Sequence, residues 1–377
     1  MGAGDSPARQ RQTFNFVFLA LLALCSGCGK VSNGPVHAYL EEPYPQNLSN
    51  WHLFVANTPS LQPSQRVIPY DLNTPLFSDY ASKYRFVWMP PGTSASYNDN
   101  GVFDFPIGTI LAKSFAFPSE ANPNKERFIE TRLLVHTKSG WVGLPYIWNA
   151  DQTEAHLDVA PDPAPIRYTD SSGKKHDFTY FIPNANECKQ CHDNNHAMQP
   201  IGPKARNLNK NFTYADGTSN QLAYWAKAGY LQGAPAADQA PKAAVWSDPK
   251  SGPLDARARA YLDNNCAHCH QPGGAANSTG VDLRLTTAAE SSSARHDSNL
   301  RTFGICKSPN SAGRVGTLTY DLVPGHPEQS ILLARMESTR PKEMMPQIGR
   351  SIVHDEGVAL IRDWIQSLPA AAPCARP

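Results

Sequence analysis

The sequence predicts an α+β multidomain protein with a β-sandwich-like N-terminal domain, a small middle segment and an all-α C-terminal domain. The chain has 377 residues, a length typical of two domains. Runs rich in aromatic and β-branched residues, such as 85–88 and 129–137, occupy the first half, and residues 138–140 are typical of a turn. Apolar residues at helical spacing follow in 254–262 and 358–368. The expected parts are residues 1–27, 28–182, 183–245 and 246–377.

The first 27 residues are expected to be an export signal rather than part of the fold. Two arginines precede an apolar run at residues 14–24, which is too short to span a bilayer comfortably. A lipoprotein signal peptidase requires small residues before the cysteine that receives the lipid. Gly27 therefore favours Cys28 over Cys25, which follows a bulky leucine. A lipid on Cys28 would anchor the protein to a bacterial membrane in the periplasm, and an ordinary signal peptide without a lipid is the alternative.

The charge balance argues against two classes of partner. The chain has 34 Lys and Arg against 33 Asp and Glu. Removing residues 1–27 deletes two arginines and one aspartate, which leaves 32 of each sign. A neutral mature chain gives no electrostatic case for binding nucleic acid or for a polybasic membrane patch. We therefore expect no nucleic-acid partner and membrane contact only through the N-terminal lipid.

Four of the eight cysteines form two pairs of identical spacing, each followed at once by a histidine. At this spacing two thiols add to the two vinyl groups of a haem, and the adjacent histidine reaches the iron. Haem c is attached outside the cytoplasm, which agrees with the export signal. A zinc site would not need a histidine after both pairs, and a thioredoxin-like dithiol is not expected twice. The sequence thus predicts two covalent haem c groups, bound by Cys188, Cys191, His192, Cys266, Cys269 and His270, the histidines being iron ligands.

Two cysteines remain beyond the signal region and the motifs, Cys306 and Cys374. In an oxidising compartment two such thiols are expected to pair as a disulfide. Two free thiols are the alternative.

Residues 246–377 are expected to form an all-α, class I cytochrome c-like domain around the second haem. One apolar stripe predicts a helix that runs into Cys266, another predicts a last helix that ends before Pro369, and a short helix is expected at 328–336. In such domains the first and last helices cross with an aromatic contact, for which Tyr261 and Trp364 are the candidates.

Met345 is the candidate sixth ligand of the second iron, because it precedes a proline in a polar loop between two predicted helices. Met344 and Met336 are its rivals, and filling a gap in the core is the ordinary use of a methionine. His268 lies inside the motif and cannot easily reach the same iron. We expect its side chain to be exposed or near a haem propionate.

The first haem is expected in a small haem-binding segment, residues 183–245. A strand-like run precedes the motif, and a helix capped by Asn220 follows it. Met198 is the candidate sixth ligand, although residues 193–197 form a short path around the haem edge from His192. The alternatives are a five-coordinate iron or ligation by His196, His156, His176 or Met89.

Seven segments are distinctive: YDLNTPLFSDYASKYRF (70–86), FPIGTILAKSF (105–115), ETRLLV (130–135), PNANECKQCH (183–192), PIGPKARNLN (200–209), ARAYLDNNCAHCH (258–270) and MMPQIG (344–349). Together they resemble a proteobacterial family of di-haem c-type cytochromes, conserved hypothetical proteins often encoded beside a parallel β-helix repeat protein. The resemblance spans about residues 45–368. It implies haem attachment at both motifs and leaves the redox partner open.

The expected function is electron transfer between periplasmic redox proteins, with the β-helix repeat protein as another candidate partner. Whether the protein is an enzyme stays open, and an electron carrier is favoured. One alternative is a peroxidase-like haem enzyme with an open iron; another is the cytochrome subunit of a periplasmic dehydrogenase. Cys266 follows His192 by only 74 positions (266 − 192), whereas di-haem peroxidases place their motifs much further apart. Because the first haem lacks an obvious sixth ligand, the enzyme remains an alternative function.

Overall fold

The computed structural model describes residues 34–55, 61–170, 173–285, 302–310, 313–369 and 374. The expected export signal and the candidate lipidation site Cys28 lie outside the described residues. Residues Asn33–Pro377 form one compact unit. Within the described part of the chain, no helix has the length and apolar character needed to cross a membrane.

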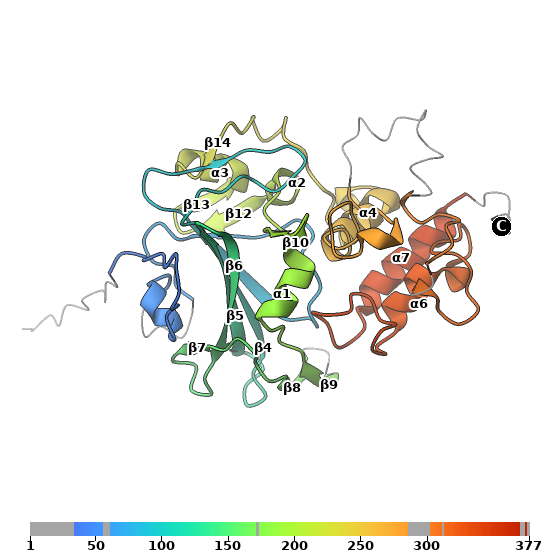
Figure 1. Cartoon of the computed structure of the whole chain (residues 1–377), viewed down its shortest axis with the longest axis horizontal. Helices are drawn as coiled ribbons and strands as arrows, with labels where there is room; N and C mark the ends of the chain where they lie inside the picture. The colour runs from blue at the N-terminus through green and yellow to red at the C-terminus, as the bar shows by residue number, and fades with distance from the viewer. Residues whose placement is uncertain are drawn as a thin grey trace, which may run out of the picture. The chain divides into compact units, whose positions relative to one another are not determined.

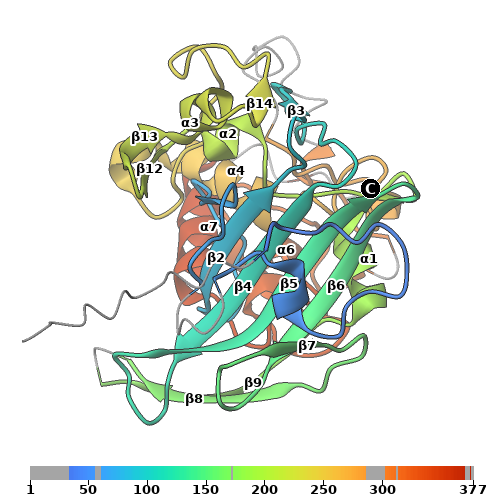
Figure 2. The same cartoon turned by 90° about the vertical axis from the view of Figure 1, so that its left-hand side faces the viewer.

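The centre of this unit is a six-stranded antiparallel sheet, whose long strands lie side by side in Figure 2. Its strands, in spatial order, are β1 (Ile68–Tyr70), β2 (Ser82–Trp88), β4 (Ile110–Pro118), β5 (Glu126–Thr137), β6 (Gly140–Trp148) and β7 (Ala155–Leu157). The neighbouring strands β5 and β6 join in a tight hairpin in which Thr137 pairs with Gly140. The predicted turn at 138–140 is therefore confirmed.

The remaining described strands form four two-stranded sheets. They pair β8 (Ala164–Thr169) with β9 (Lys175–Tyr180), β10 (Asp193–Asn194) with β11 (Ala197–Met198), β12 (Asn211–Tyr214) with β13 (Gly217–Asn220), and β3 (Ala95–Ser96) with β14 (Leu231–Gln232). The α-helices are α1 (Ala185–His192), α2 (Ala205–Leu208), α3 (Gln221–Lys227), α4 (Leu254–Asn265), α6 (Ile331–Glu337) and α7 (Asp355–Ser367). Short 3₁₀ turns are η1 (Leu48–Trp51), η2 (Pro249–Ser251), η3 (Asn277–Thr279) and η6 (Pro327–Gln329).

Both faces of the main sheet are covered, because side chains alternate between them along each strand. On one face, residues such as Phe86 and Leu133 pack against Leu48 and Trp51 from the N-terminal segment. This segment runs across strands β4 to β6 in Figure 2. On the other face, Val87 and Leu111 belong to a core with α2 and α3, to which Trp225 contributes a fully buried ring.

The helices predicted from regularly spaced apolar residues lie at the expected positions in the structure. α4 ends at Asn265, directly before Cys266, and α7 ends before Pro369. Asn220 caps α3, and its side chain accepts a hydrogen bond from the backbone N–H of Leu222. These helix predictions are confirmed.

Tyr261 and Trp364 form their aromatic contacts with other residues rather than with each other as expected. Both residues are buried in the core shared by α4 and α7. Among the described residues, however, Trp364 pairs edge-to-face with Phe303, and Tyr261 with Trp246. The indole N–H of Trp364 donates to Asp255 of α4 at 2.9 Å, so the two helices are joined by that hydrogen bond and by aliphatic packing.

The predicted fold class is wrong in two respects. The N-terminal region is built on one six-stranded antiparallel sheet rather than on two large sheets packed as a β-sandwich. The N-terminal segment, α2, α3 and the small β8–β9 sheet each bury part of its faces. The C-terminal region is not an all-α class I cytochrome c-like domain. Its described part has α4, α6 and α7 joined by long irregular segments with isolated β-bridges.

The C-terminal helices lie beside the sheet-bearing half in Figure 1, and hydrogen bonds join the two. The carboxylate of Asp79 accepts from the backbone N–H groups of Ser351 and Ile352 at 2.8 and 3.0 Å. The side-chain oxygen of Asn265 accepts from the N–H of Phe77 at 2.7 Å. Since these bonds are buried or partly buried, the region shares its stability with the rest of the unit.

Cys306 and Cys374 are joined by a disulfide, with their Cα atoms 5.2 Å apart. The bond ties the chain end to the segment that precedes α6. Tyr320 adds a hydrogen bond from its hydroxyl to the carbonyl of Cys374 at 3.2 Å.

Candidate functional site

The first Cys-x-x-Cys-His motif forms most of α1. The helix begins here because the Asn184 side chain accepts from the N–H groups of Asn186 and Glu187, each at 2.9 Å. The Glu187 carboxylate in turn accepts from the N–H of Asn184 at 2.9 Å. This capping box satisfies N–H groups that a helix start leaves unpaired. It allows a helix of eight residues to hold Cys188 and Cys191 in a fixed arrangement.

His192 ends α1, and the backbone orients its ring. Its Nδ1 lies 2.6 Å from the carbonyl oxygen of Gln199. Because a carbonyl only accepts, Nδ1 carries the proton and Nε2 keeps its lone pair. Burial lowers the pKa of His192 to about 4, which favours the neutral ring. A neutral imidazole held in this way through Nδ1 is the form that binds a metal.

The second motif follows α4 directly. Cys266 is the C-cap residue, and its N–H donates to the carbonyl of Leu262 at 2.9 Å. The chain then turns, so that the N–H of His270 donates to the carbonyl of Cys266 at 3.0 Å. Thr279 Oγ1 donates to the carbonyl of Ala276 and lies 3.3 Å from Nδ1 of His270, from which it accepts. Burial lowers the pKa of His270 to about 4, so this ring is also neutral.

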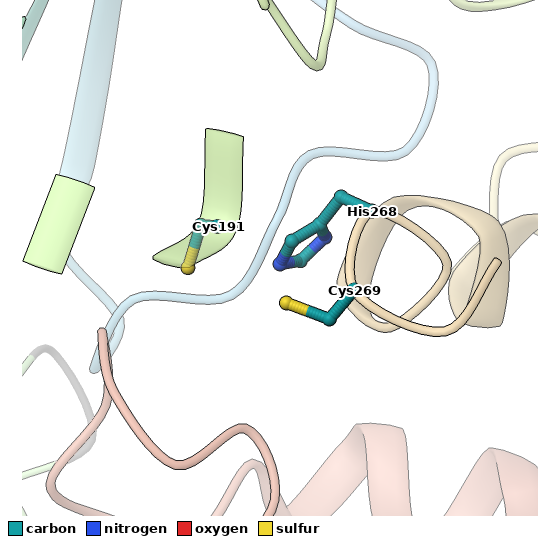
Figure 3. Close-up of side chains that lie close together, drawn as sticks. All are labelled: Cys191, His268 and Cys269. Atoms are coloured by element: carbon teal, nitrogen blue, oxygen red, sulfur yellow. The ribbon is translucent and has the colours of Figure 1, made fainter. Parts of the chain in front are cut away.

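The two motifs contact each other across 74 positions of sequence. Ligand atoms of Cys191, His268 and Cys269 all lie within 4.8 Å of one another. Figure 3 shows the three side chains converging on the same space. The Cys269 thiol also donates to the carbonyl of Gln190 at 3.5 Å. The contact with Cys269 is the largest cause that lowers the pKa of Cys191, to about 4, and the same contact raises the pKa of Cys269.

Each motif lines a cavity of its own. Cavity 1 has about 1300 Å³ including its opening to solvent, contains all three functional residues of the first motif, and has β4, β5 and β6 as one wall. Cavity 2 has about 1440 Å³ on the same measure and contains those of the second motif. The two cavities are adjacent, because four residues line both: Cys191, His268, Pro346 and Ile348.

Met345 lies in the lining of cavity 2 together with His270 and Met336, whereas Met344 is not part of that lining. The backbone of Met345 is held on both sides. Its N–H donates to the carbonyl of Arg335 at 2.9 Å, and its carbonyl accepts from Arg350 at 3.0 Å. The structure thus brings the predicted ligand pair of the second haem to one cavity.

The structure does not bring the candidate ligands of the first haem into cavity 1. Met198 lies in β11, close to Gly143 of β6, outside the lining of the cavity. The others lie elsewhere: His196 is exposed, His156 contacts Asn47, His176 pairs with Asp170, and Met89 is fully buried in the sheet core. Among the described residues that line cavity 1, the histidines are His192 and His268.

Two features of cavity 1 are not apparent in the sequence. His268 is 6% exposed, so of its two expected placements the exposed one is wrong, and its Nδ1 has no hydrogen-bond partner among the described residues. Three basic residues, Arg85, Lys113 and Arg132, line the cavity from three strands. Because side chains alternate between faces along a strand, the sequence can indicate which residues of one strand share a face. The alignment of these three residues across strands depends on the strand register, which the sequence does not reveal.

Comparisons with protein-family models, with curated proteins and with solved structures found no match. The two motifs, their cavities and the contact between them are therefore the basis for a function.

Proposed function

We propose that the chain is an exported di-haem c-type cytochrome that transfers electrons through two covalently bound haems. One observation carries this proposal. Each Cys-x-x-Cys-His motif lines its own cavity, and the two motifs meet at Cys191 and Cys269. A pair of motifs used for unrelated structural purposes has no reason to be arranged in this way.

The residues present fit haem c. None of the four motif cysteines is part of a disulfide, so all four are available for attachment. In attachment, each S–H adds across a vinyl C=C: sulfur bonds one vinyl carbon, the hydrogen goes to the other, and no external oxidant is needed. His192 and His270 each use Nδ1 for a hydrogen bond and leave Nε2 for iron. Leu111 and Leu134 on the wall of cavity 1 supply apolar surface suited to a porphyrin face.

When bound, haem supplies an iron that gains or loses one electron. The residues of this chain determine where each haem is held and which atoms bind its iron. His192 and His270 would each bind one iron, and Met345 would fill the sixth position of the second, which raises its potential. The Asn195 N–H donates to the carbonyl of Gly273 at 2.8 Å, a hydrogen bond that holds the segments after the two motifs together. This arrangement favours transfer of electrons between the haems.

Electron donors and acceptors are proposed to be periplasmic redox proteins, with a parallel β-helix repeat protein as another candidate. We place the protein in the periplasm, held at the membrane by a lipid on Cys28. The apolar run at residues 14–24 and the chemistry of haem c, which is attached outside the cytoplasm, support this location.

A peroxidase-like enzyme is the second candidate, because none of the methionines and histidines proposed as the first distal ligand lines cavity 1. An iron without a sixth protein ligand binds small molecules, as a peroxidase requires. Two six-coordinate irons, which small molecules do not reach, would instead support the electron-carrying role.

The test is to produce the full chain in a bacterial periplasm with a c-type haem maturation system. Haem per chain, haem retained after denaturation, and spectra with and without carbon monoxide are then measured. Two covalent haems and no response to carbon monoxide are expected. A response of half of the haem favours the enzyme.

Two paired variants localise the result. The double variants Cys188→Ala/Cys191→Ala and Cys266→Ala/Cys269→Ala should each retain one haem. If the wild type holds no covalent haem but one zinc per chain, the Cys191, His268 and Cys269 cluster is a metal site and the cytochrome proposal is wrong.

A further inference from the structure

Three basic residues form a row across the sheet wall of cavity 1. Strand register pairs Arg85 of β2 with Lys113 of β4, and Lys113 with Arg132 of β5. Neighbouring strands are about 4.8 Å apart. Like charges directly opposite each other destabilise a sheet, and buried charges need compensation. The row therefore indicates an anion in the cavity.

Two of the three cations have acidic partners, and one of these is incompletely paired. Arg132 donates through Nε and Nη2 to both oxygens of Glu130, at 2.7 and 2.5 Å. Arg85 donates through Nη1 to Asp71 at 2.9 Å, but its buried Nη2 has no partner among the described residues. Asp71 is also shared with Lys210, at 2.8 Å. A donor of Arg85 thus remains available.

Lys113 has no carboxylate partner among the described residues, and its Nζ lies 4.6 Å from the centroid of the Phe115 ring. Burial is the first cause that lowers the pKa of Lys113 well below its usual value, followed by Arg85 and Arg132. A carboxylate beside the amine would restore its charge. Glu187, which also lines the cavity, already accepts from the start of α1.

The row leads away from the attachment helix. α1 packs against β6, and Arg132 is on the adjacent strand, β5. Lys113 is one strand further and Arg85 two, so the far end lies about 10 Å beyond Arg132. Haem carries its two propionate carboxylates on the edge away from its vinyl groups. A haem attached at Cys188 with its plane along the sheet would direct those carboxylates to the far end of the row.

We propose that Lys113 and Arg85 bind the propionate carboxylates of the haem attached at Cys188 and Cys191. This inference rests on the proposed function of the chain. A small external carboxylate offers the same chemistry, and the experiment separates the two sources.

The experiment compares holoproteins by equilibrium redox titration. Lys113→Met removes the amine and keeps an unbranched stem, whereas Lys113→Arg keeps the charge. Lys138→Met is the control, because Lys138 is an exposed lysine that pairs with Glu41 and lies outside the cavity lining. In Lys113→Met, one of the two haem transitions should move to lower potential, since the lost positive charge no longer offsets the propionate. The other two variants should retain both wild-type transitions.

The second arm titrates wild-type holoprotein with succinate and follows its thermal midpoint. No change is expected, because propionates already occupy the site. A succinate-dependent rise that Lys113→Met abolishes would assign the site to an external carboxylate and overturn the proposal. Unchanged transitions in Lys113→Met overturn it as well. If that variant does not retain two haems, Lys113→Gln replaces it, with a shift in the same direction expected.

Haem content is measured first on the wild type. Absence of covalent haem refutes the proposed function, and this inference with it. Two covalent haems with no effect at Lys113 refute the inference alone.

Discussion

A buried ion pair joins the segment after the first motif to the helix before the second. Arg206 of α2 donates through Nη2 to both oxygens of Asp263 of α4 at 2.9 and 3.0 Å, and through Nε at 3.2 Å. The Asp263 side chain is fully buried, and that of Arg206 is 7% exposed. Asp263 also accepts from the N–H of Leu285 at 2.9 Å. Its carboxylate is therefore the centre of a network between the two halves of the site.

Asp263→Asn should lower the free energy of unfolding substantially. Removing one charge of a buried pair costs about 3–5 kcal/mol, because the other charge is left uncompensated. Arg206 keeps a hydrogen bond to the carbonyl of Asn100 at 2.7 Å, so we expect about 3 kcal/mol, the lower end. Urea unfolding of the holoprotein, followed by circular dichroism, measures the loss. The control is Asp177→Asn in an exposed pair with Arg167, which should cost under about 1 kcal/mol.

The pH dependence has a definite sign. Burial alone would raise the pKa of Asp263, but Lys204 and Arg206 outweigh it and lower the pKa below its usual value. The stabilisation is therefore complete above the unfolded pKa of about 4 and is lost as pH falls through the folded pKa. The difference between wild type and Asp263→Asn should be constant above about pH 5 and shrink in acid. A loss below about 1 kcal/mol at pH 7, or a difference that grows in acid, would refute this account.

Two further predictions concern the C-terminal region. If the second haem is bound as proposed, Met345→Ala should open its iron, so that carbon monoxide changes the spectrum of half of the haem. Met344 lies outside the lining of cavity 2, so the spectrum of Met344→Ala should not change with carbon monoxide. The reverse pattern would assign the ligand to Met344. Cys374→Ser removes a disulfide between cysteines 68 positions apart, and loop entropy alone predicts a loss of roughly 4 kcal/mol in urea unfolding. Equal stability of Cys374→Ser and wild type would mean that the bond does not restrict the unfolded chain as assumed.

The sequence predicts local structure well where one segment carries the whole signal. The apolar stripes of α4 and α7 and the cap at Asn220 are contained within single helices, so their bounds follow from spacing. The hairpin between β5 and β6 likewise follows from a turn and its flanking strands. The Cys-x-x-Cys-His spacing is equally local, which is why both motifs are evident from the order of the residues alone.

The errors concern contacts between distant segments. Nothing periodic in the N-terminal segment indicates that Leu48 and Trp51 cover one face of the sheet, so the sequence favours a second sheet instead. The burial of His268 depends on α1 lying against the second motif. The row that contains Lys113 depends on the register of three strands, and a shift of one residue would turn its side chain to the other face.

The contact between Cys191 and Cys269 also bears on the order in which the protein is assembled. Completed folding brings these thiols together, and in an oxidising compartment two adjacent thiols are prone to form a disulfide. A bond between them would consume one attachment point of each haem at once. On the proposed function, at least one motif must receive its haem before the two halves of the site close on each other.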